Sequence, residues 1–105
     1  MVTLYDAPDC WKCVEVKEAL DALGLEFEPV TVRGDPVARA ALVAAQGEPP
    51  QVPMLVDDGL AVWDRRRILA YLRQTYGGDV AGQVPFREMP AFMGGVCAID
   101  GSGCG

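Results

Sequence analysis

Two cysteines separated by two residues stand near the start of the chain, in the stretch Pro8-Asp9-Cys10-Trp11-Lys12-Cys13. The β-branched and apolar run over residues 2–5 precedes this stretch and predicts a short buried strand. After it, apolar residues recur at three- and four-residue steps, and Gly24 follows as a stop signal. This spacing predicts a helix from about Lys12 to Leu23. The cysteine pair therefore opens a helix directly after a strand.

The position of the pair favours thiol chemistry. A cysteine at a helix N-terminus faces free backbone N–H groups and the positive end of the helix dipole, which stabilise the thiolate. Lys12 adds a cation, and such placement lowers the thiol pKa from about 8.5 into a range of roughly 3.5 to 7.5. We expect Cys10, as the more exposed thiol, to attack a disulfide beside the flat surface of Trp11, and Cys13 to resolve the mixed disulfide. Two buried structural cysteines are the alternative, which we rank lower.

The composition limits the classes of protein. The chain has 105 residues, half of them apolar, with a formal net charge of −6, so we expect one globular domain and no nucleic-acid partner. We find no apolar run near the roughly 18 to 20 residues that cross a bilayer and no leader, so we expect a cytoplasmic protein without a membrane partner. In that reducing compartment a cysteine pair is more often catalytic or metal-binding than a permanent crosslink. The chain has no histidine, which excludes mixed Cys/His zinc sites.

The rest of the chain continues to alternate strands and helices. The pattern predicts strands over 27–32, 54–56 and 60–63, and helices over 36–46 and from Asp64 to near Gly77. The order βαβαββα places the first two strands parallel around a crossover helix, and an antiparallel hairpin completes a small mixed four-stranded α/β sheet. We divide the chain into a domain over 1–77 and a C-terminal extension over 78–105. The extension should pack back in part and fray toward its end.

These motifs resemble those of known families. A strand, Cys-X-X-Cys at a helix start and Val-Pro ahead of a hairpin resemble the glutaredoxin group of the thioredoxin fold. Residues 51–71 are similar to the N-terminal glutathione-binding domain of glutathione transferases. The resemblance covers about residues 1–77 and implies a thioredoxin-like (glutaredoxin) fold, a cis peptide bond between Val52 and Pro53, and a thiol-disulfide site beside it.

The same resemblance implies a glutathione site. The backbone of Val52 would pair with the cysteinyl part of glutathione or of a peptide, with Gln51 and Pro53 alongside. Alternatively, the proline only marks the start of a strand. Asp64 matches the acidic residue of the transferase pattern, which implies contact with the γ-glutamyl amine, but Arg65 stands where that pattern has serine.

The arginines after Asp64 leave several interpretations open. Three consecutive arginines, residues 65–67, oppose the helix dipole but also make an anion site. One interpretation is that they assist glutathione binding, and another is that they receive the carboxylates of a different thiol cofactor or of an acidic partner protein. A plain solvated cluster, with Asp64 acting only as a helix N-cap, is the remaining interpretation.

A second pair of cysteines, Cys97 and Cys104, lies in the extension. We rank a peripheral disulfide or unused thiols first, and a second redox pair that exchanges with Cys10 and Cys13 second. A zinc or iron–sulfur site made by all four cysteines comes last, because six intervening residues match common ligand spacings poorly.

Three classes of function follow. The leading one is a glutaredoxin-type thiol-disulfide oxidoreductase, which serves electron transport and cell redox homeostasis by reducing protein or glutathione mixed disulfides through Cys10 and Cys13. Its electrons would come from glutathione or a thioredoxin reductase, and we expect no bound metal. The second class is a transferase-like glutathione-binding module, which would not need Cys13 and normally carries an all-helical second domain. The third is a metal or iron–sulfur carrier.

Overall fold

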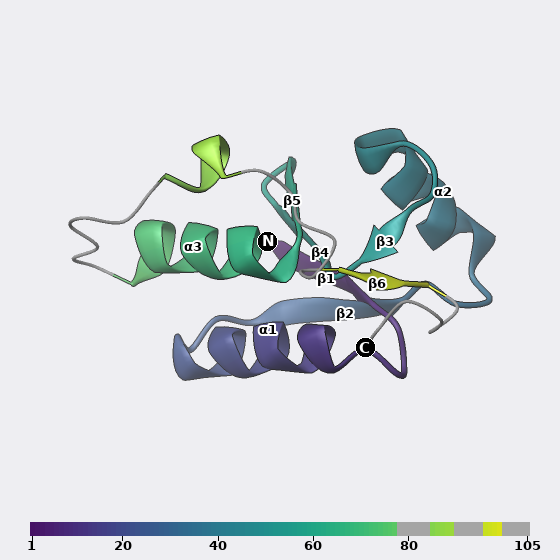
Figure 1. Ribbon diagram of the computed structural model, residues 1–105. Coiled ribbons are helices and arrows are strands. Elements are labelled where there is room, and N and C mark those ends of the chain that lie inside the picture. Colours follow the sequence, from purple (N-terminus) through teal and green to yellow (C-terminus); the bar gives the residue numbers. More distant parts are fainter. Residues whose placement is uncertain (78–84, 90–95, 100–105) are drawn as a thin grey trace.

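A computed structural model describes residues 1–77, 85–89 and 96–99 of the chain (Figure 1). The elements, in chain order, are β1 (Val2–Asp6), α1 (Trp11–Ala22), β2 (Phe27–Thr31), α2 (Pro36–Gln46), β3 (Gln51–Val52), β4 (Met54–Asp57), β5 (Leu60–Trp63), α3 (Arg65–Tyr76), the 3-10 turn η1 (Phe86–Glu88) and β6 (Cys97–Ala98). Among the described residues, no helix has the length and apolar character needed to cross a membrane.

Four strands form the central sheet in the order β2-β1-β4-β5. β1 pairs parallel with β2, and it pairs antiparallel with β4, which turns at Asp58 and Gly59 into β5. Asp58 and Gly59 both have positive φ, at 49° and 87°, as a tight hairpin turn requires. A separate two-stranded sheet joins β3 to β6 in antiparallel register.

Each face of the central sheet is covered by helices. Alternate strand residues point to opposite faces, so Leu4 and Leu55 pack with α1 and α3, whereas Tyr5 and Met54 belong to the cluster on the α2 side. Figure 1 shows α1 and α3 lying together on one side of the strands and α2 on the other. This three-layer α/β arrangement is the thioredoxin-like fold, so the predicted fold class is confirmed.

The predicted elements agree with the structure where local signals bound them. Helix α2 starts after Asp35, whose carboxylate accepts hydrogen bonds from the amides of Val37 and Ala38, and ends at Gly47 with a φ of 84°. The cis peptide bond between Val52 and Pro53 is also confirmed, and a second one joins Glu48 to Pro49. Strands β3 and β6 and the turn η1 were not predicted.

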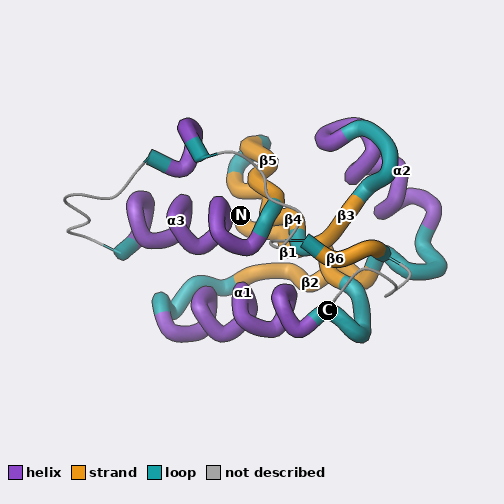
Figure 2. The backbone as a smooth tube through the Cα atoms, viewed as in Figure 1, coloured by secondary structure: helices purple, strands orange, loops and turns teal. Residues whose placement is uncertain are grey.

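The extension packs back on the domain where it is described. Phe86 is buried, and its ring meets that of Tyr71 edge-on at a centroid distance of 4.9 Å. Segment 96–99 lies alongside β3 (Figure 2). The division into a domain over 1–77 and an extension over 78–105 stays a prediction, and Cys104 lies outside the described residues.

Candidate active site

Cys10 caps the N-terminus of α1. Its backbone is extended, with φ −97° and ψ 98°, and its sulfur accepts a 3.1 Å hydrogen bond from the amide of Cys13. The Cys10 carbonyl also accepts hydrogen bonds from the amides of Cys13 and Val14, which begin the helix. The strand-to-helix turn therefore aims the backbone amide of Cys13 at the Cys10 sulfur, in keeping with the predicted position of the pair at a helix N-terminus.

The two thiols differ in acidity. A hydrogen bond from the Cys13 side chain is the main reason that the pKa of Cys10 falls to about 7; burial opposes it, and the backbone amides and the charge of Lys12 assist it. The same interaction and burial raise the pKa of Cys13 far above its ordinary value. Near neutral pH, Cys10 therefore has thiolate character while Cys13 holds its proton.

Both thiols of the pair are buried, so the expected difference in exposure between Cys10 and Cys13 is small. Cys10 is only 2 % exposed and Cys13 only 1 %. The apolar cluster around them includes Val52 and Cys97. The cover comes in part from β6, a segment more than eighty residues away in the sequence, which the local pattern around the pair does not reveal.

Cys97 lies against Cys10. Their sulfur atoms are 3.1 Å apart, and the Cys10 thiol donates to the Cys97 sulfur. Cys97 is itself disulfide-bonded and 1 % exposed, whereas Cys10 and Cys13 are free thiols. The interpretation ranked first from the sequence was a peripheral disulfide or unused thiols. The structure has a disulfide at Cys97, but this disulfide is buried beside Cys10 and is not peripheral.

Lys12 and Trp11 flank the thiol from the first turn of α1. Lys12 is only 3 % exposed, and its ammonium group donates a 3.1 Å hydrogen bond to the carbonyl of Val96. The same ammonium lies 5.2 Å from the centroid of the Trp11 ring, close enough for a cation–π contact. Lys12 thus acts both on the charge of Cys10 and on the segment that covers it.

The segment before Pro53 borders the same site. Gln51 and Val52 pair with Ala98 and Cys97, respectively, so the backbone edge expected to bind a cysteinyl group already holds one. The side chain of Gln46, at the end of α2, fixes Gln51 through hydrogen bonds of 2.8 and 2.9 Å to its carbonyl and from its amide. Pro53 is buried beside them.

The turn at Asp64 adjoins α1. Asp64 has a φ of 83°, is fully buried and accepts a 2.9 Å hydrogen bond from the amide of Arg66, so its N-cap function is confirmed. Arg65 forms a 2.7 Å ion pair with Glu15 and lies 5.7 Å from the Trp11 ring centroid. Arg65 is thus engaged by neighbouring side chains, whereas Arg66 is exposed. Whether Asp64 and Arg65 contact glutathione stays a prediction.

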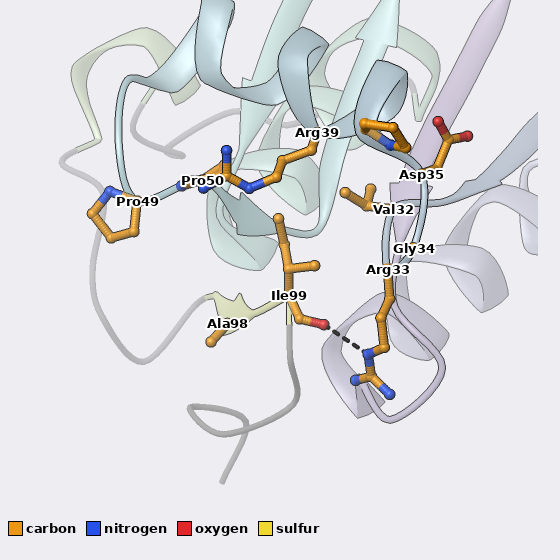
Figure 3. A pocket seen from close by; sticks show the side chains of 10 residues that line it. Val32, Arg33, Gly34, Asp35, Arg39, Pro49, Pro50, Ala98 and Ile99 are labelled. Atoms are coloured by element: carbon orange, nitrogen blue, oxygen red, sulfur yellow. Dashed lines mark hydrogen bonds between the residues drawn. The ribbon is translucent and has the colours of Figure 1, made fainter.

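A cavity of about 540 Å³ is lined in part by Ala98 and Ile99 of the segment that carries β6 (Figure 3). Arg33, just after β2, forms part of its wall and donates 3.1 Å hydrogen bonds to the carbonyl of Ile99 and to the carboxylate of Asp9. Sequence reasoning missed the roles of Arg33 and of residues 96–99. The apolar run over 96–99 was the available signal for a short strand.

In the described part of the chain, no group of three or more acidic or cysteine side chains is arranged to hold a metal ion.

Comparisons with known proteins identify the family and the fold of the chain. Residues 4–80 match the family model of the glutathione S-transferase N-terminal domain. Glutathione transferase E6 from Drosophila melanogaster is 38 % identical over 77 % of this chain, with a TM-score of 0.62, but the chain spans only 37 % of that transferase.

The chain spans a larger share of two small redoxins than of the transferase. NrdH-redoxin from Escherichia coli, described as a glutaredoxin-like protein with a thioredoxin-like activity profile, is 27 % identical over 70 % of this chain and 92 % of its own, with a TM-score of 0.60. The thioredoxin-like protein BC3987, solved as a point mutant, is 29 % identical over 74 % of this chain and 96 % of its own, with a TM-score of 0.63. No curated protein matches the chain. On the family model, the chain belongs to the glutathione S-transferase N-terminal domain family within the thioredoxin-like fold.

Proposed function

We propose that the protein is a thiol-disulfide oxidoreductase that uses Cys10 as nucleophile and Cys13 as resolving thiol. The observation that carries the proposal is the asymmetry of the pair. Cys10 caps α1 and has a pKa lowered to about 7, chiefly by the hydrogen bond from Cys13, whereas the pKa of Cys13 is raised. This difference in pKa supports Cys10 as the attacking thiolate and Cys13 as the thiol that stays protonated until the second step.

The reaction has two exchange steps. The Cys10 thiolate attacks one sulfur of a substrate disulfide, forming a mixed disulfide and releasing the other sulfur as a thiolate that takes up a proton. Cys13 then loses its proton and attacks the Cys10 sulfur, which releases the reduced substrate and leaves a Cys10–Cys13 disulfide. Two electrons pass from the dithiol to the substrate.

We assign the regeneration of the dithiol to glutathione, with a thioredoxin reductase as the other donor. The match of residues 4–80 to the glutathione S-transferase N-terminal domain supports glutathione. Protein or glutathione mixed disulfides are then the substrate class, and the reducing cytoplasm is the compartment in which such a dithiol works.

A glutathione-binding module without redox turnover is the second candidate. The match of residues 4–80 to the transferase N-terminal domain favours it. It differs from the first candidate in one respect that an assay can measure: binding glutathione does not need Cys13, whereas dithiol turnover on protein disulfides does.

The test is reduction of a small glutathione mixed disulfide and of a disulfide-containing protein, each coupled to glutathione or to thioredoxin reductase. Cys10→Ser and Cys13→Ser are compared with the wild-type chain. We expect Cys10→Ser to abolish turnover of both substrates, and Cys13→Ser to abolish protein disulfide reduction while glutathione can still resolve the small mixed disulfide. Glutathione binding without turnover on any substrate would instead identify a binding module.

A further inference from the structure

β6 lies where an extended disulfide substrate would pair beside the nucleophile. Val52 pairs with Cys97 and Gln51 with Ala98 in antiparallel register. Val52 is also the residue immediately before the cis Pro53. A strand added to such an edge gains main-chain hydrogen bonds whatever its side chains are. The chain therefore supplies its own strand to the edge next to Cys10.

The two sulfurs are close enough to react. The Cys10 and Cys97 sulfurs are 3.1 Å apart, within the roughly 3 to 3.5 Å of a near-attack geometry. Cys10 is a free thiol and Cys97 is disulfide-bonded. Thiol–disulfide exchange starts from this arrangement, a thiol beside one sulfur of a disulfide.

Two cations hold the ends of the segment. The Lys12 ammonium donates to the carbonyl of Val96 over 3.1 Å, and Nε of Arg33 donates to the carbonyl of Ile99 over 3.1 Å (Figure 3). Arg33 is fixed in turn by Asp9, next to Cys10 in the sequence. The contacts at both ends are made to main-chain carbonyls, so they position the backbone on either side of Cys97.

Building on the proposed oxidoreductase function, we propose that segment 96–99 is a built-in substrate strand and that Cys97 is the sulfur that Cys10 attacks within the chain. Cys97 is then a third redox-active cysteine of the protein. As in the proposed function, Cys10 attacks first, here on the Cys97 sulfur, and Cys13 then resolves the mixed disulfide.

The exchange balances within one chain. The Cys10 thiolate attacks the Cys97 sulfur, the Cys10–Cys97 bond forms, and the bond from Cys97 to its original partner breaks, so that this partner leaves as a thiolate and takes up a proton. The bond that breaks is the disulfide that Cys97 already makes. Cys13 then loses its proton and attacks the Cys10 sulfur, which releases Cys97 as a thiol. Two electrons move from the Cys10–Cys13 pair to the disulfide of Cys97, and glutathione or another external thiol re-reduces the Cys10–Cys13 pair.

This occupancy also restricts outside substrates. The edge at Val52 pairs with one strand at a time, and Cys10 is 2 % exposed while β6 is in place. A glutathione or peptide disulfide that uses this edge must therefore displace segment 96–99.

The experiment traps the first intermediate in the full-length Cys13→Ser chain. This variant retains Cys10, Cys97 and Cys104, is oxidised mildly, and is then alkylated and digested without reduction. Cleavage before Asp100 separates the peptides of Cys97 and Cys104 for mass spectrometry. We expect the Cys10–Cys97 linked peptide to be at least about tenfold more abundant than a Cys10–Cys104 link, at a yield independent of protein concentration.

The strand pairing is tested by two substitutions at Ala98 in the same background. Ala98→Pro removes a main-chain donor of β6, and Ala98→Gly is the matched control that keeps it. We expect the proline variant to form the Cys10–Cys97 link about tenfold more slowly than the glycine variant. Equal rates would overturn the assignment of β6 as a substrate strand.

A wild-type measurement guards against failure of the Cys13→Ser chain to fold. Wild-type chain with Cys97 oxidised and Cys10 and Cys13 reduced should convert to a Cys10–Cys13 disulfide with free Cys97. Small-disulfide turnover by the wild-type chain is measured alongside. Turnover without any exchange at Cys97 overturns the built-in substrate and leaves the oxidoreductase standing, whereas loss of both overturns the proposed function as well.

Discussion

The ammonium group of Lys12 donates a 3.1 Å hydrogen bond to the carbonyl of Val96, so a cation in the first turn of α1 holds the segment that carries Cys97. Lys12 is almost completely buried, and its charge also helps to lower the pKa of Cys10. One side chain therefore links the acidity of the nucleophile to the cover over it.

Replacing Lys12 with methionine should disturb both properties. Lys12→Met keeps the apolar stem but removes the charge, so we expect the pKa of Cys10 to rise from about 7 and the amides of residues 96–99 to exchange with solvent faster. Ultraviolet titration of the thiolate and hydrogen exchange measure the two effects. Lys12→Arg, which keeps a cation, should retain most of each. An unchanged titration and unchanged exchange in Lys12→Met would deny Lys12 both roles.

The reactivity of Cys10 should depend on pH in a defined direction. Its pKa lies near 7 rather than at the ordinary 9.0, so the rate of attack on a small disulfide should rise as the pH passes through about 7 and level off above it. Because the hydrogen bond from Cys13 is the main cause, Cys13→Ala should shift this rise toward higher pH. Cys13→Ser keeps a hydroxyl donor and should shift it less. A single-turnover pH profile with the same midpoint in all three chains would contradict the assigned cause.

A substitution at Asp64 tests whether this residue contributes to glutathione binding. Asp64→Asn keeps a side-chain oxygen for the Arg66 amide but removes the negative charge that the resemblance assigns to the γ-glutamyl amine. Loss of a charged hydrogen bond of about 1.5 kcal/mol corresponds to an increase of roughly tenfold in KM for glutathione. We expect kcat to change less, and a melting curve checks the fold. An unchanged KM would limit Asp64 to its N-cap role.

A substitution at Tyr71 should change the stability of the fold without changing the redox chemistry. Its hydroxyl donates a 2.6 Å hydrogen bond to Asp57, at the end of β4 remote from Cys10. Tyr71→Phe should lower the free energy of unfolding by about 1 to 3 kcal/mol and leave disulfide reduction intact. Tyr76→Phe, at a more exposed donor to the same carboxylate, should cost less. A large loss of activity in a folded Tyr71→Phe chain would contradict this separation.

The pH dependence of stability follows from the same carboxylate. Burial raises the pKa of Asp57, but the hydrogen bonds from Tyr71 and Tyr76 outweigh burial and hold the pKa below its ordinary value of 3.8. The stabilisation is therefore present above that value and is lost as the pH falls through the lower folded value. Denaturation of wild type and Tyr71→Phe at neutral and acidic pH should show their stabilities converging in acid.

The sequence predicted those elements that local signals define. Asp35, Pro36 and Gly47 bound α2, and the spacing around Cys10 and Cys13 placed both at the start of α1, because caps and periodicity act over a few residues. The cis bond before Pro53 came from the family resemblance, since spacing alone does not distinguish the isomers.

The cover over the site could not be predicted in this way. β3 and β6 are two residues long, too short for any periodicity, and their pairing joins Val52 to Cys97 across the chain. The burial of Cys10 and Lys12 depends in part on that pairing. Asp64 likewise has a positive φ that its residue type does not predict, and its complete burial appears only in the folded structure.

The order of events at Cys10 and Cys13 tests the central claim most directly. The Cys97→Ser, Cys104→Ser double variant, fully reduced, is mixed with glutathione disulfide, and samples are alkylated at successive times and mapped by mass spectrometry. We predict a glutathione adduct on Cys10 first, followed by a Cys10–Cys13 disulfide. An adduct that forms first on Cys13, or no reaction at either cysteine in a folded chain, would contradict the proposed mechanism.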